Sequence, residues 1–270
     1  MKAQKTKMAS HDILIKLAQS AAQRVARAQE SVPLEDLKKQ ALLLPSTDFL
    51  FERALEKPGM SFICEIKKAS PSKGVIAHDF PYMDIAREYA QAGADCISVL
   101  TEPTQFLGSL NYLDEISHEV DVPCLRKDFI VHEYMIYEAK IAGASAVLLI
   151  CSILTPEQLK AYINLAHELG MSALVEVHDK DEAQMACDAG ARIVGVNNRN
   201  LRDFTVDTTN SARIRSAVPD DILFVSESGI SNPEEVALLE TLGVDAVLVG
   251  EYLMRATNKQ EALEHLRGEL

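Results

Sequence analysis

From residue 61 onward, short apolar runs alternate with stretches whose apolar residues recur at helical spacing. The eight runs cover residues 62–67, 96–101, 122–127, 146–151, 173–177, 193–197, 222–226 and 246–250. Short runs rich in Val, Ile and Leu are typical of strands that are buried on both faces of a parallel sheet. Strands and helices are therefore predicted to alternate along most of the chain, which is the pattern of an α/β protein.

Glycines recur at four junctions between a predicted helix and the next predicted strand. They are Gly93, Gly143, Gly190 and Gly243. Glycine is favoured there because many helices end in a residue of left-handed conformation. Successive glycines are about two βα units apart, so the junctions indicate a repeated unit.

About eight such units favour a closed (β/α)8 barrel, the TIM-barrel fold, over an open doubly wound sheet, which more often has five or six strands. An open dinucleotide-binding sheet would also carry G-x-G-x-x-G after an early strand, and the sequence has none. We therefore predict one (β/α)8 barrel domain over residues 1–270.

Three helices are predicted before the first strand. Apolar residues recur at three- and four-residue steps in residues 11–29, Pro33 precedes a second helical segment at 34–44, and a third covers 49–55. Residues 1–58 are thus predicted to form an N-terminal helical extension. Later in the chain, Thr155 with Gln158 and Ser231 with Glu234 predict capping boxes.

Charge and composition limit the classes of partner. The formal net charge of −13 argues against nucleic acid or an anionic membrane as the main partner, because both require an extended basic surface. A small anionic ligand needs only a local cluster of cations. The sequence shows no signal peptide core or membrane span, and the five dispersed cysteines predict reduced, buried thiols in a cytoplasmic protein. The seven histidines form no tight ligand set, so no metal site is expected. His132 and His178 lie near predicted strand ends and are expected to be solvated or loop-capping.

In a TIM barrel, chemistry gathers at the C-terminal ends of the strands. The residues at those predicted ends are Glu65, Lys67, Thr101, Glu102, Lys127, Ser152, Glu176, Asn197, Arg199, Glu227, Ser228, Gly250 and Glu251. Polar loop residues are common, so any one of them is weak evidence. Glu65, Lys127 and Glu176 are stronger, because their neighbours are apolar and a buried charge requires a partner.

Lys127 and Glu176, on the third and fifth predicted strands, are candidates for an acid and a base that flank a small substrate. A lysine kept cationic by carboxylates can donate a proton, and a carboxylate in a partly apolar wall can accept one. Such a pair suits ring closure, elimination or isomerisation. Two other interpretations of Lys127 remain open: an ordinary surface lysine, and a Schiff-base lysine of the aldolase kind.

The loops after the last two strands predict an anion site. Residues 226–230 and 248–251 contain Gly229 and Gly250, where backbone N–H groups can approach a ligand closely. These two loops commonly hold phosphate in this fold. Lys67 would add a positive charge.

Five segments together resemble the motifs of indole-3-glycerol phosphate synthases, in the order of that family. They are EIKKASPS at 65–72, LRKDF at 125–129, LVEVH at 174–178, GVNNRNL at 195–201 and SESGI at 226–230. The resemblance implies a TIM barrel whose N-terminal helices cover the mouth. It implies that 1-(2-carboxyphenylamino)-1-deoxyribulose 5-phosphate, an anionic phosphosugar, is converted to indole-3-glycerol phosphate in tryptophan biosynthesis. It implies no metal or organic cofactor, and it leaves contacts with other enzymes of that pathway open.

The resemblance also implies roles for the charged residues. Lys127 would be the general acid that protonates the substrate carbonyl during closure, and Glu176 the general base of the later dehydration. Glu65 and Asn197 would orient these groups, while Lys67 would meet the substrate's anionic groups.

The remaining residues are implied to bind substrate. Ser70, Arg199 and Glu227 would belong to the polar wall, and Ser228, Gly229, Gly250 and Glu251 would contact phosphate mainly through their backbone. Phe106, Phe129 and Leu201 would line the pocket for the anthranilate ring. Leu107 and Tyr252 depart from the family pattern in ways that bear on pocket shape. The alternative is another phosphosugar-binding barrel, either an isomerase or a Schiff-base aldolase.

Overall fold

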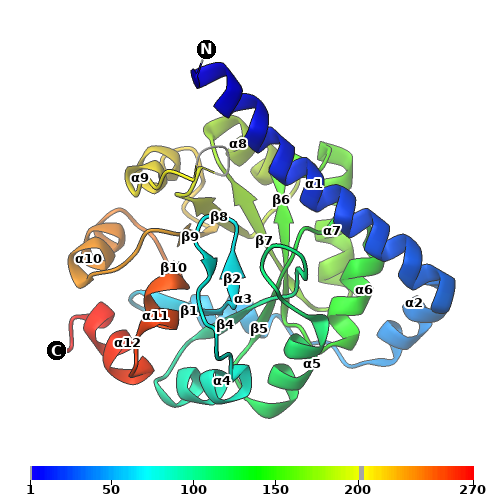
Figure 1. The fold of residues 1–270 in the computed structure, drawn as a ribbon, viewed down its shortest axis with the longest axis horizontal. Helices are drawn as coiled ribbons and strands as arrows, with labels where there is room; N and C mark the ends of the chain where they lie inside the picture. Colours follow the sequence, from blue (N-terminus) through cyan, green and yellow to red (C-terminus); the bar gives the residue numbers. More distant parts are fainter. Residues whose placement is uncertain (1, 201–203) are drawn as a thin grey trace.

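The computed structural model describes residues 2–200 and 204–270, with side chains described from residue 13 onward. Within these ranges, eight parallel strands close into a barrel, and helices between successive strands surround it (Figure 1). The hydrogen-bonded order is β1-β10-β9-β8-β7-β6-β5-β4, so β1 closes the barrel by pairing with both β10 and β4. The predicted TIM barrel is confirmed.

The barrel strands lie within one or two residues of the predicted runs. They are β1 (Ser61–Ile66), β4 (Cys96–Leu100), β5 (Cys124–Lys127), β6 (Ala146–Ile150), β7 (Ser172–Val177), β8 (Ile193–Asn197), β9 (Leu223–Glu227) and β10 (Ala246–Val249). A small hairpin, β2 (Ala69–Ser70) and β3 (Gly74–Val75), follows β1.

The helices of the outer ring follow the strands in turn. They are α4 (Tyr82–Gln91), α5 (Leu110–Glu119), α6 (Glu133–Ile141), α7 (Pro156–Glu168), α8 (Lys180–Asp188), α9 (Thr209–Arg215), α10 (Pro233–Thr241) and α12 (Lys259–Arg267), with the short η1 (Cys151–Ile153) after β6 and α11 (Glu251–Arg255) after β10.

The glycine junctions have the predicted conformation. Gly93, Gly143, Gly190 and Gly243 have φ values of 77°, 74°, 89° and 74°. The left-handed backbone ends each helix and turns the chain into the next strand, which explains why glycine recurs there. The recurrence of glycine in the sequence therefore follows from the repeated helix-to-strand junction of the barrel.

Of the two predicted capping boxes, one is confirmed and one is wrong by a residue. Thr155 and Gln158 form the reciprocal bonds of a capping box at the start of α7. At α10 the cap is Asn232, whose side chain accepts the N–H of Glu235, and Ser231 lies one position outside. Pro233 suits the first helical position and so shifts the cap to the residue before it.

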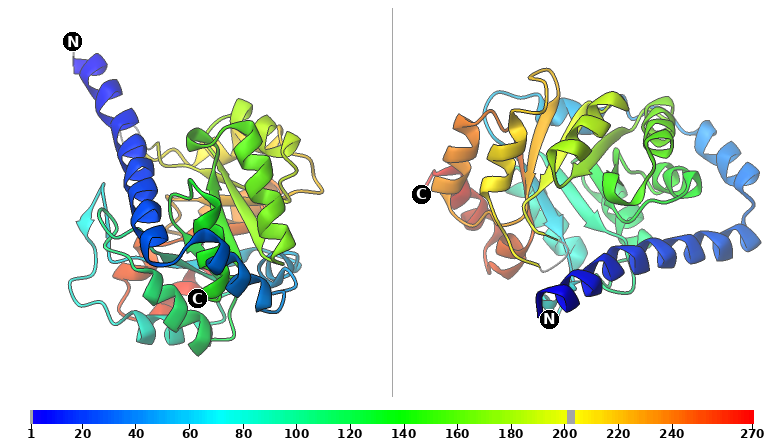
Figure 2. Two further views of the ribbon diagram at one scale, coloured as in Figure 1. Left: turned by 90° about the vertical axis from the view of Figure 1, so that its right-hand side faces the viewer. Right: turned by 90° about the horizontal axis from the view of Figure 1, so that it is seen from above.

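The N-terminal helices lie at both ends of the barrel. Helix α1 (Lys2–Ser31) crosses the end where the strands terminate, and α2 (Leu34–Leu43) follows it (Figure 2). Helix α3 (Leu50–Leu55) lies at the opposite end, where the N–H of Phe49 donates to Gly170 O at 3.2 Å. Helix α1 begins nine residues before the predicted segment, because residues 2–10 contain good helix formers although they were outside the apolar pattern. The division into one domain with residues 1–58 as an extension stays a prediction.

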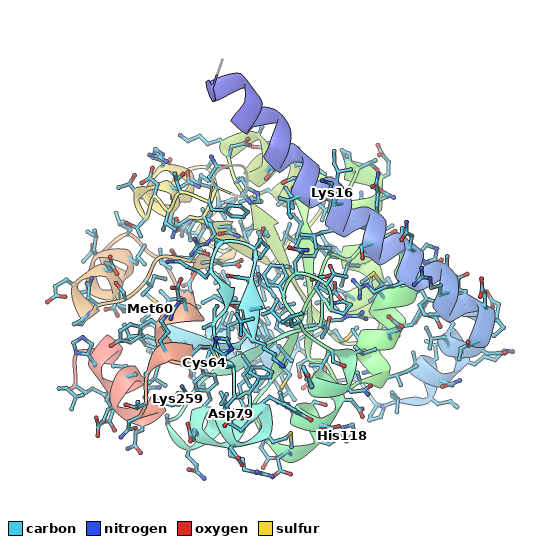
Figure 3. The ribbon with its side chains drawn as sticks, viewed as in Figure 1. Lys16, Met60, Cys64, Asp79, His118 and Lys259 are labelled. Carbon is cyan, nitrogen blue, oxygen red and sulfur yellow. The ribbon has the colours of Figure 1, made fainter. Side chains whose placement is uncertain are left out.

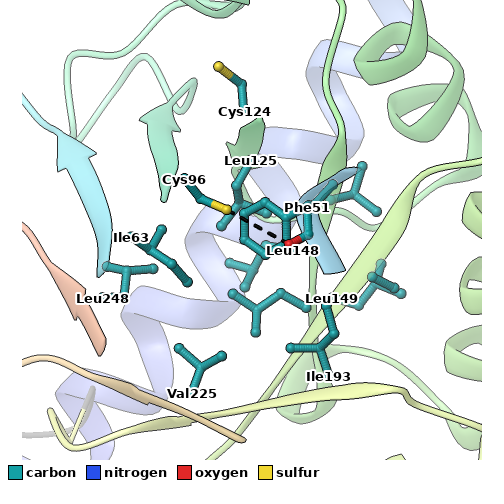
Figure 4. Close-up of a cluster of buried hydrophobic side chains, with 14 of the residues drawn as sticks. Phe51, Ile63, Cys96, Cys124, Leu125, Leu148, Leu149, Ile193, Val225 and Leu248 are labelled. Atoms are coloured by element: carbon teal, nitrogen blue, oxygen red, sulfur yellow. Dashed lines mark hydrogen bonds between the residues drawn. The ribbon is translucent and has the colours of Figure 1, made fainter. Parts of the chain in front are cut away.

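Apolar side chains fill the barrel interior (Figure 4). Ile63, Leu148, Ile193 and Val225 are at most 2% exposed and come from four different strands. Phe51 of α3 is fully buried at the end of the barrel where the strands begin, and its carbonyl accepts a weak hydrogen bond from the Cys96 thiol at 3.8 Å. Full burial of each such side chain contributes about 1.5–3 kcal/mol, so the barrel is a packed core and the strand ends have a fixed geometry.

The cysteines and the outer surface agree with the expectations from composition. All five cysteines are free thiols, four of them buried, and Figure 3 labels Cys64 of β1 and His118 of the outer helix α5. In the part of the chain that the structure describes, no helix is both long enough and apolar enough to cross a membrane.

Candidate active site

A cavity of about 380 Å³ opens at the C-terminal ends of the strands. Leu148 and Leu248 of the barrel interior contribute to its lining, and Ile13, Leu14 and Leu17 of α1 cover it. Fourteen of the residues predicted from the sequence line this cavity: Glu65, Lys67, Ser70, Phe106, Lys127, Phe129, Glu176, Asn197, Arg199, Glu227, Ser228, Gly229, Gly250 and Glu251. Leu201 lies outside the described residues.

Glu65 and Lys67 project side by side and form an ion pair, as the two-residue period of a strand predicts. Burial raises the pKa of the Glu65 carboxyl, but the charges of Lys67 and Lys127 outweigh burial and hold this pKa below its usual value. Gly250 packs against the pair. A Cβ at this position would lie 2.5 Å from Glu65 Oε1 and 3.0 Å from Lys67 Nζ, so only glycine leaves room for both groups.

Lys127 lies between two buried carboxylates. Its Nζ is 3.7 Å from Glu176 Oε2 and 3.5 Å from Glu227 Oε2. Burial lowers the pKa of the Lys127 ammonium, but the charges of Glu227 and Glu176 outweigh burial and raise it above its usual range. Lys127 is therefore cationic near neutral pH. Lys127 and Glu176 lie at ion-pair distance, as opposite charges in a desolvated cavity favour. That the two groups flank a substrate stays a prediction.

Glu227 is the most perturbed carboxyl of the site. Burial raises its pKa to about 8, the nearby carboxylates add to this, and Lys127 only partly offsets it. Neither carboxyl oxygen has a hydrogen-bond partner among the described residues, because Lys127 lies at ion-pair distance without hydrogen-bond geometry. Gly195 makes room for this group, since a Cβ there would lie 2.3 Å from Glu227 Oε1. Glu227 therefore loses its proton at higher pH than an ordinary carboxyl does.

Asn197 connects the ends of two strands. Its side-chain oxygen accepts the backbone N–H of Arg199 and the hydroxyl of Ser228, both at 3.0 Å. Ser228 and Gly229 follow β9 with φ values of 71° and 87°. Asn197 thus fixes the start of a loop whose backbone borders the cavity.

Aromatic and charged side chains complete the surroundings of the cavity. The rings of Phe106 and Phe129 lie 6.0 Å apart between centroids and are tilted by 39°. Lys73, in the hairpin after β1, lies 3.3 Å from Glu251 Oε1, and Arg199 lies 3.9 Å from Glu251 Oε2. The cavity therefore combines an apolar wall with a charged rim.

Comparison with known proteins identifies the family to which this constellation belongs. The model of the family "Indole-3-glycerol phosphate synthase" matches residues 14–266. The chain belongs to this family. Indole-3-glycerol phosphate synthase of Ruminiclostridium cellulolyticum is 51% identical over 257 residues, covering 95% of this chain and 99% of that protein. The enzyme of the same name from Lactiplantibacillus plantarum is 52% identical over 258 residues, covering 94% and 98%.

A solved structure agrees with the fold. A 3-hexulose-6-phosphate synthase superposes with a TM-score of 0.60 at 16% identity, covering 78% of this chain and 100% of that chain. At this level of identity the likeness supports the barrel alone.

Two contacts of this indole-3-glycerol phosphate synthase family member were missed from the sequence. Asp128, directly after Lys127, is fully buried and accepts two hydrogen bonds from Arg24 of α1, at 2.7 and 3.0 Å. Arg24 lies three residues after Ala21 and seven after Leu17, so it shares the buried face of α1. That spacing was visible in the sequence, but the partner 104 residues away was not.

The second missed contact joins His178 to Glu176. The sequence suggested a solvated or loop-capping histidine, but only 20% of its side chain is exposed and its Nε2 lies 3.6 Å from Glu176 Oε1. Glu176 and His178 are two residues apart on β7 and its extension, so their side chains lie on the same face. The similar expectation for His132 is confirmed, because its side chain caps α6 by accepting the N–H of Tyr134.

Among the described residues, no group of three or more His, Cys, Asp or Glu side chains is arranged to hold a metal ion. The expectation that the reaction requires no metal or organic cofactor stays a prediction.

Proposed function

We propose that the chain catalyses the conversion of 1-(2-carboxyphenylamino)-1-deoxyribulose 5-phosphate to indole-3-glycerol phosphate, carbon dioxide and water. Membership of the family, a carboxy-lyase family of tryptophan biosynthesis, supports this reaction. The observation that carries the chemistry is the cationic Lys127 held between Glu176 and Glu227 at the mouth of the barrel.

The proton balance of the reaction defines what the site must do. Closure joins the ring carbon that bears the carboxylate to the substrate carbonyl carbon and adds one proton to the carbonyl oxygen. Loss of carbon dioxide returns the bonding electrons to the ring and restores aromaticity. Dehydration adds a second proton to the same oxygen, which leaves as water, and removes one proton from the neighbouring carbon. One proton is consumed overall for each ionised substrate carboxylate.

Lys127 supplies the first proton. A raised pKa keeps this ammonium protonated, and burial among carboxylates directs it into the cavity, so it can polarise and protonate the carbonyl oxygen. Glu227 lies 3.5 Å from Nζ, and because its pKa is raised it is the neighbour from which Lys127 recovers a proton.

Glu176 removes the proton of the dehydration step. Its carboxylate is buried, lies 3.7 Å from Lys127, and lines the same cavity, so the acid and the base reach the two adjacent carbons of one substrate. Glu65 and Asn197 orient these groups through the Lys67 pair and the loop after β9.

The rest of the cavity suits the two ends of the substrate. Phe106 and Phe129, under the apolar residues of α1, form a wall for the anthranilate ring. Lys67 and Arg199 supply positive charge, and the backbone after β9 and β10 is open to phosphate. Ser70 belongs to the hairpin after β1, which we propose closes over bound substrate as a lid.

The Schiff-base aldolase alternative is disfavoured by the charge state of Lys127. Attack on a carbonyl requires a neutral amine, and such lysines have lowered pKa values, whereas the carboxylates here raise the pKa of Lys127. Borohydride added during turnover is therefore expected to trap no adduct on Lys127. A trapped adduct would support the aldolase and remove the acid role.

We place the reaction in the cytoplasm, because the four buried thiols suit a reducing compartment. The proposed function is tested by mixing the purified chain with the carboxyphenylamino-deoxyribulose phosphate and recording indole fluorescence. Product formation that scales with protein concentration is expected. Folded protein that forms no product at high concentration would reject the function.

A further inference from the structure

Two buried polar atoms face each other beside the proposed base. Glu176 Oε1 and His178 Nε2 lie 3.6 Å apart, and neither has a hydrogen-bond partner among the described residues. Buried polar atoms are rarely left unsatisfied, because each costs about 1–3 kcal/mol. A proton held between the two would satisfy both atoms.

The other ring nitrogen of His178 is held by a second carboxylate. Nδ1 lies 3.2 Å from Glu182 Oε2 and 3.3 Å from Ser152 Oγ. The same Glu182 oxygen accepts the backbone N–H of His178 at 2.8 Å, which fixes the carboxylate. A carboxylate at Nδ1 favours the tautomer with its proton there, and so leaves the lone pair of Nε2 directed at Glu176.

His178 also lies beside a second cavity, which shares Leu14 and Asn197 with the active-site cavity. Glu176 lines the active-site cavity, whereas His178 and Glu182 line a second, polar cavity of about 560 Å³. We call this the side cavity; Asp179, Asp207 and Arg213 contribute to its polar lining. A proton that leaves Glu176 through His178 would therefore reach the side cavity without crossing the substrate.

On the basis of the proposed function, we propose that His178 is a positioning residue that relays the proton taken up by Glu176 into the side cavity. In dehydration the Glu176 carboxylate becomes a carboxylic acid, and it must lose that proton before the next turnover. The acid transfers its proton to Nε2, which regenerates the carboxylate and makes His178 an imidazolium. The imidazolium then loses one proton to water in the side cavity and returns to the neutral ring.

The surrounding charges set the charge state of the relay. Burial lowers the pKa of His178, but the hydrogen bond and charge of Glu182 and the charges of Glu176 and Glu227 outweigh burial and raise it above the ordinary value. The remaining neighbours are Ser152 on η1, Asp179 at the start of α8, and Asn210 of α9, whose amide donates to His178 O at 3.3 Å. The neutral ring that accepts a proton is thus favoured as pH rises, and the relay slows as pH falls.

The test uses His178→Gln and His178→Ala in the full chain, with His118→Gln on the exposed surface of α5 as the matched control. We expect kcat to fall at least about tenfold in both variants while KM is unchanged, since the relay follows substrate binding. Added imidazole is expected to restore kcat of His178→Ala in proportion to its concentration, because the free base can occupy the vacated position. The control is expected to match the wild type.

Kinetics and an NMR titration together separate a proton relay from a purely structural role for His178. Wild-type kcat in both His178 variants at every pH would overturn the relay. A fall in kcat that added imidazole does not reverse would also overturn it, because that result indicates a structural role. A wild type without activity would instead reject the proposed function. One further measurement does not need turnover. In an NMR titration, His178 should lose its proton at lower pH in Glu176→Gln than in the wild type. An unchanged titration would contradict the coupling that the relay requires.

Discussion

The buried contact between Arg24 and Asp128 should hold α1, which covers the active-site cavity, against the end of β5, which carries Lys127. Arg24→Met keeps much of the apolar stem and removes two charge-assisted hydrogen bonds, each worth about 1.5–3 kcal/mol. Asp128 retains the Thr101 hydroxyl at 2.7 Å and the N–H of Phe129 at 2.8 Å, so it is not left unsatisfied. Asp128 also keeps its ion pair with Arg126 at 3.4 Å. The expected loss is therefore about 2–3 kcal/mol, below the sum of about 3–6 kcal/mol for two such bonds and below the 3–5 kcal/mol for a buried charge without a partner.

This loss should appear in the docking of α1. A change of about 2 kcal/mol lowers the docking equilibrium constant roughly 30-fold. Because Ile13, Leu14 and Leu17 cover the cavity, KM for the substrate should rise more than kcat falls. Hydrogen exchange of the α1 amides should accelerate, whereas exchange in the barrel strands should not change.

The contact also has a pH signature. Burial raises the pKa of Asp128, but Arg24 and Arg126 outweigh burial and hold it below the ordinary value. The stability from this group is therefore present above the unfolded-state pKa and is lost as pH falls through the folded-state value. Arg24→Met should weaken that acid dependence. Arg27→Met, on an exposed position of the same helix, is the control. Unchanged α1 exchange and unchanged KM in Arg24→Met would show that Arg24 does not hold α1 over the cavity.

Two further variants, with Gly190→Ala as a control, test the packing of the carboxylates. The pKa of Glu227, raised from 4.5 to about 8, means that the native state holds a proton which the unfolded state loses, so this group lowers stability as pH rises from 4.5 to 8. Glu227→Gln should remove this slope, with a gain of at most about 5 kcal/mol at pH 8 in urea unfolding; parallel slopes in both proteins would contradict it. Gly250→Ala should lower kcat at least about tenfold with little loss of stability, because its Cβ would displace Glu65 and Lys67. Gly190→Ala, where the Cβ meets nothing within 4 Å but φ is 89°, should cost about 1–2 kcal/mol of stability and leave kcat unchanged. Normal turnover by Gly250→Ala would show that the Glu65–Lys67 pair tolerates a Cβ there.

The barrel was predictable because its signals are local. Strand runs such as 62–67 and 193–197 are set by apolar character over a few residues, and Gly93 or Gly143 marks a backbone conformation that few other residues adopt. The start of α1 was not predicted, because the apolar pattern begins later than the helix does. The cap at Asn232 was missed because a favourable Ser231 precedes it.

The candidate site was predictable as a list of residues more than as a geometry. The rule that strand ends gather in a barrel brings Glu65, Lys127 and Glu176 together from positions far apart in sequence. Which side chains touch depends on burial and on small differences in strand stagger. The Lys127–Glu176 ion pair and the Arg24–Asp128 pair were therefore beyond sequence patterns.

A single-turnover experiment that follows carbon dioxide and indole fluorescence together distinguishes the role of Lys127 from that of Glu176. Lys127→Met should release neither product at an appreciable rate, because protonation of the carbonyl precedes the loss of carbon dioxide. Glu176→Gln should release carbon dioxide ahead of indole fluorescence, since only the later dehydration needs the base. Simultaneous release of both products in Glu176→Gln, or release of carbon dioxide by Lys127→Met at the wild-type rate, would contradict this division of roles.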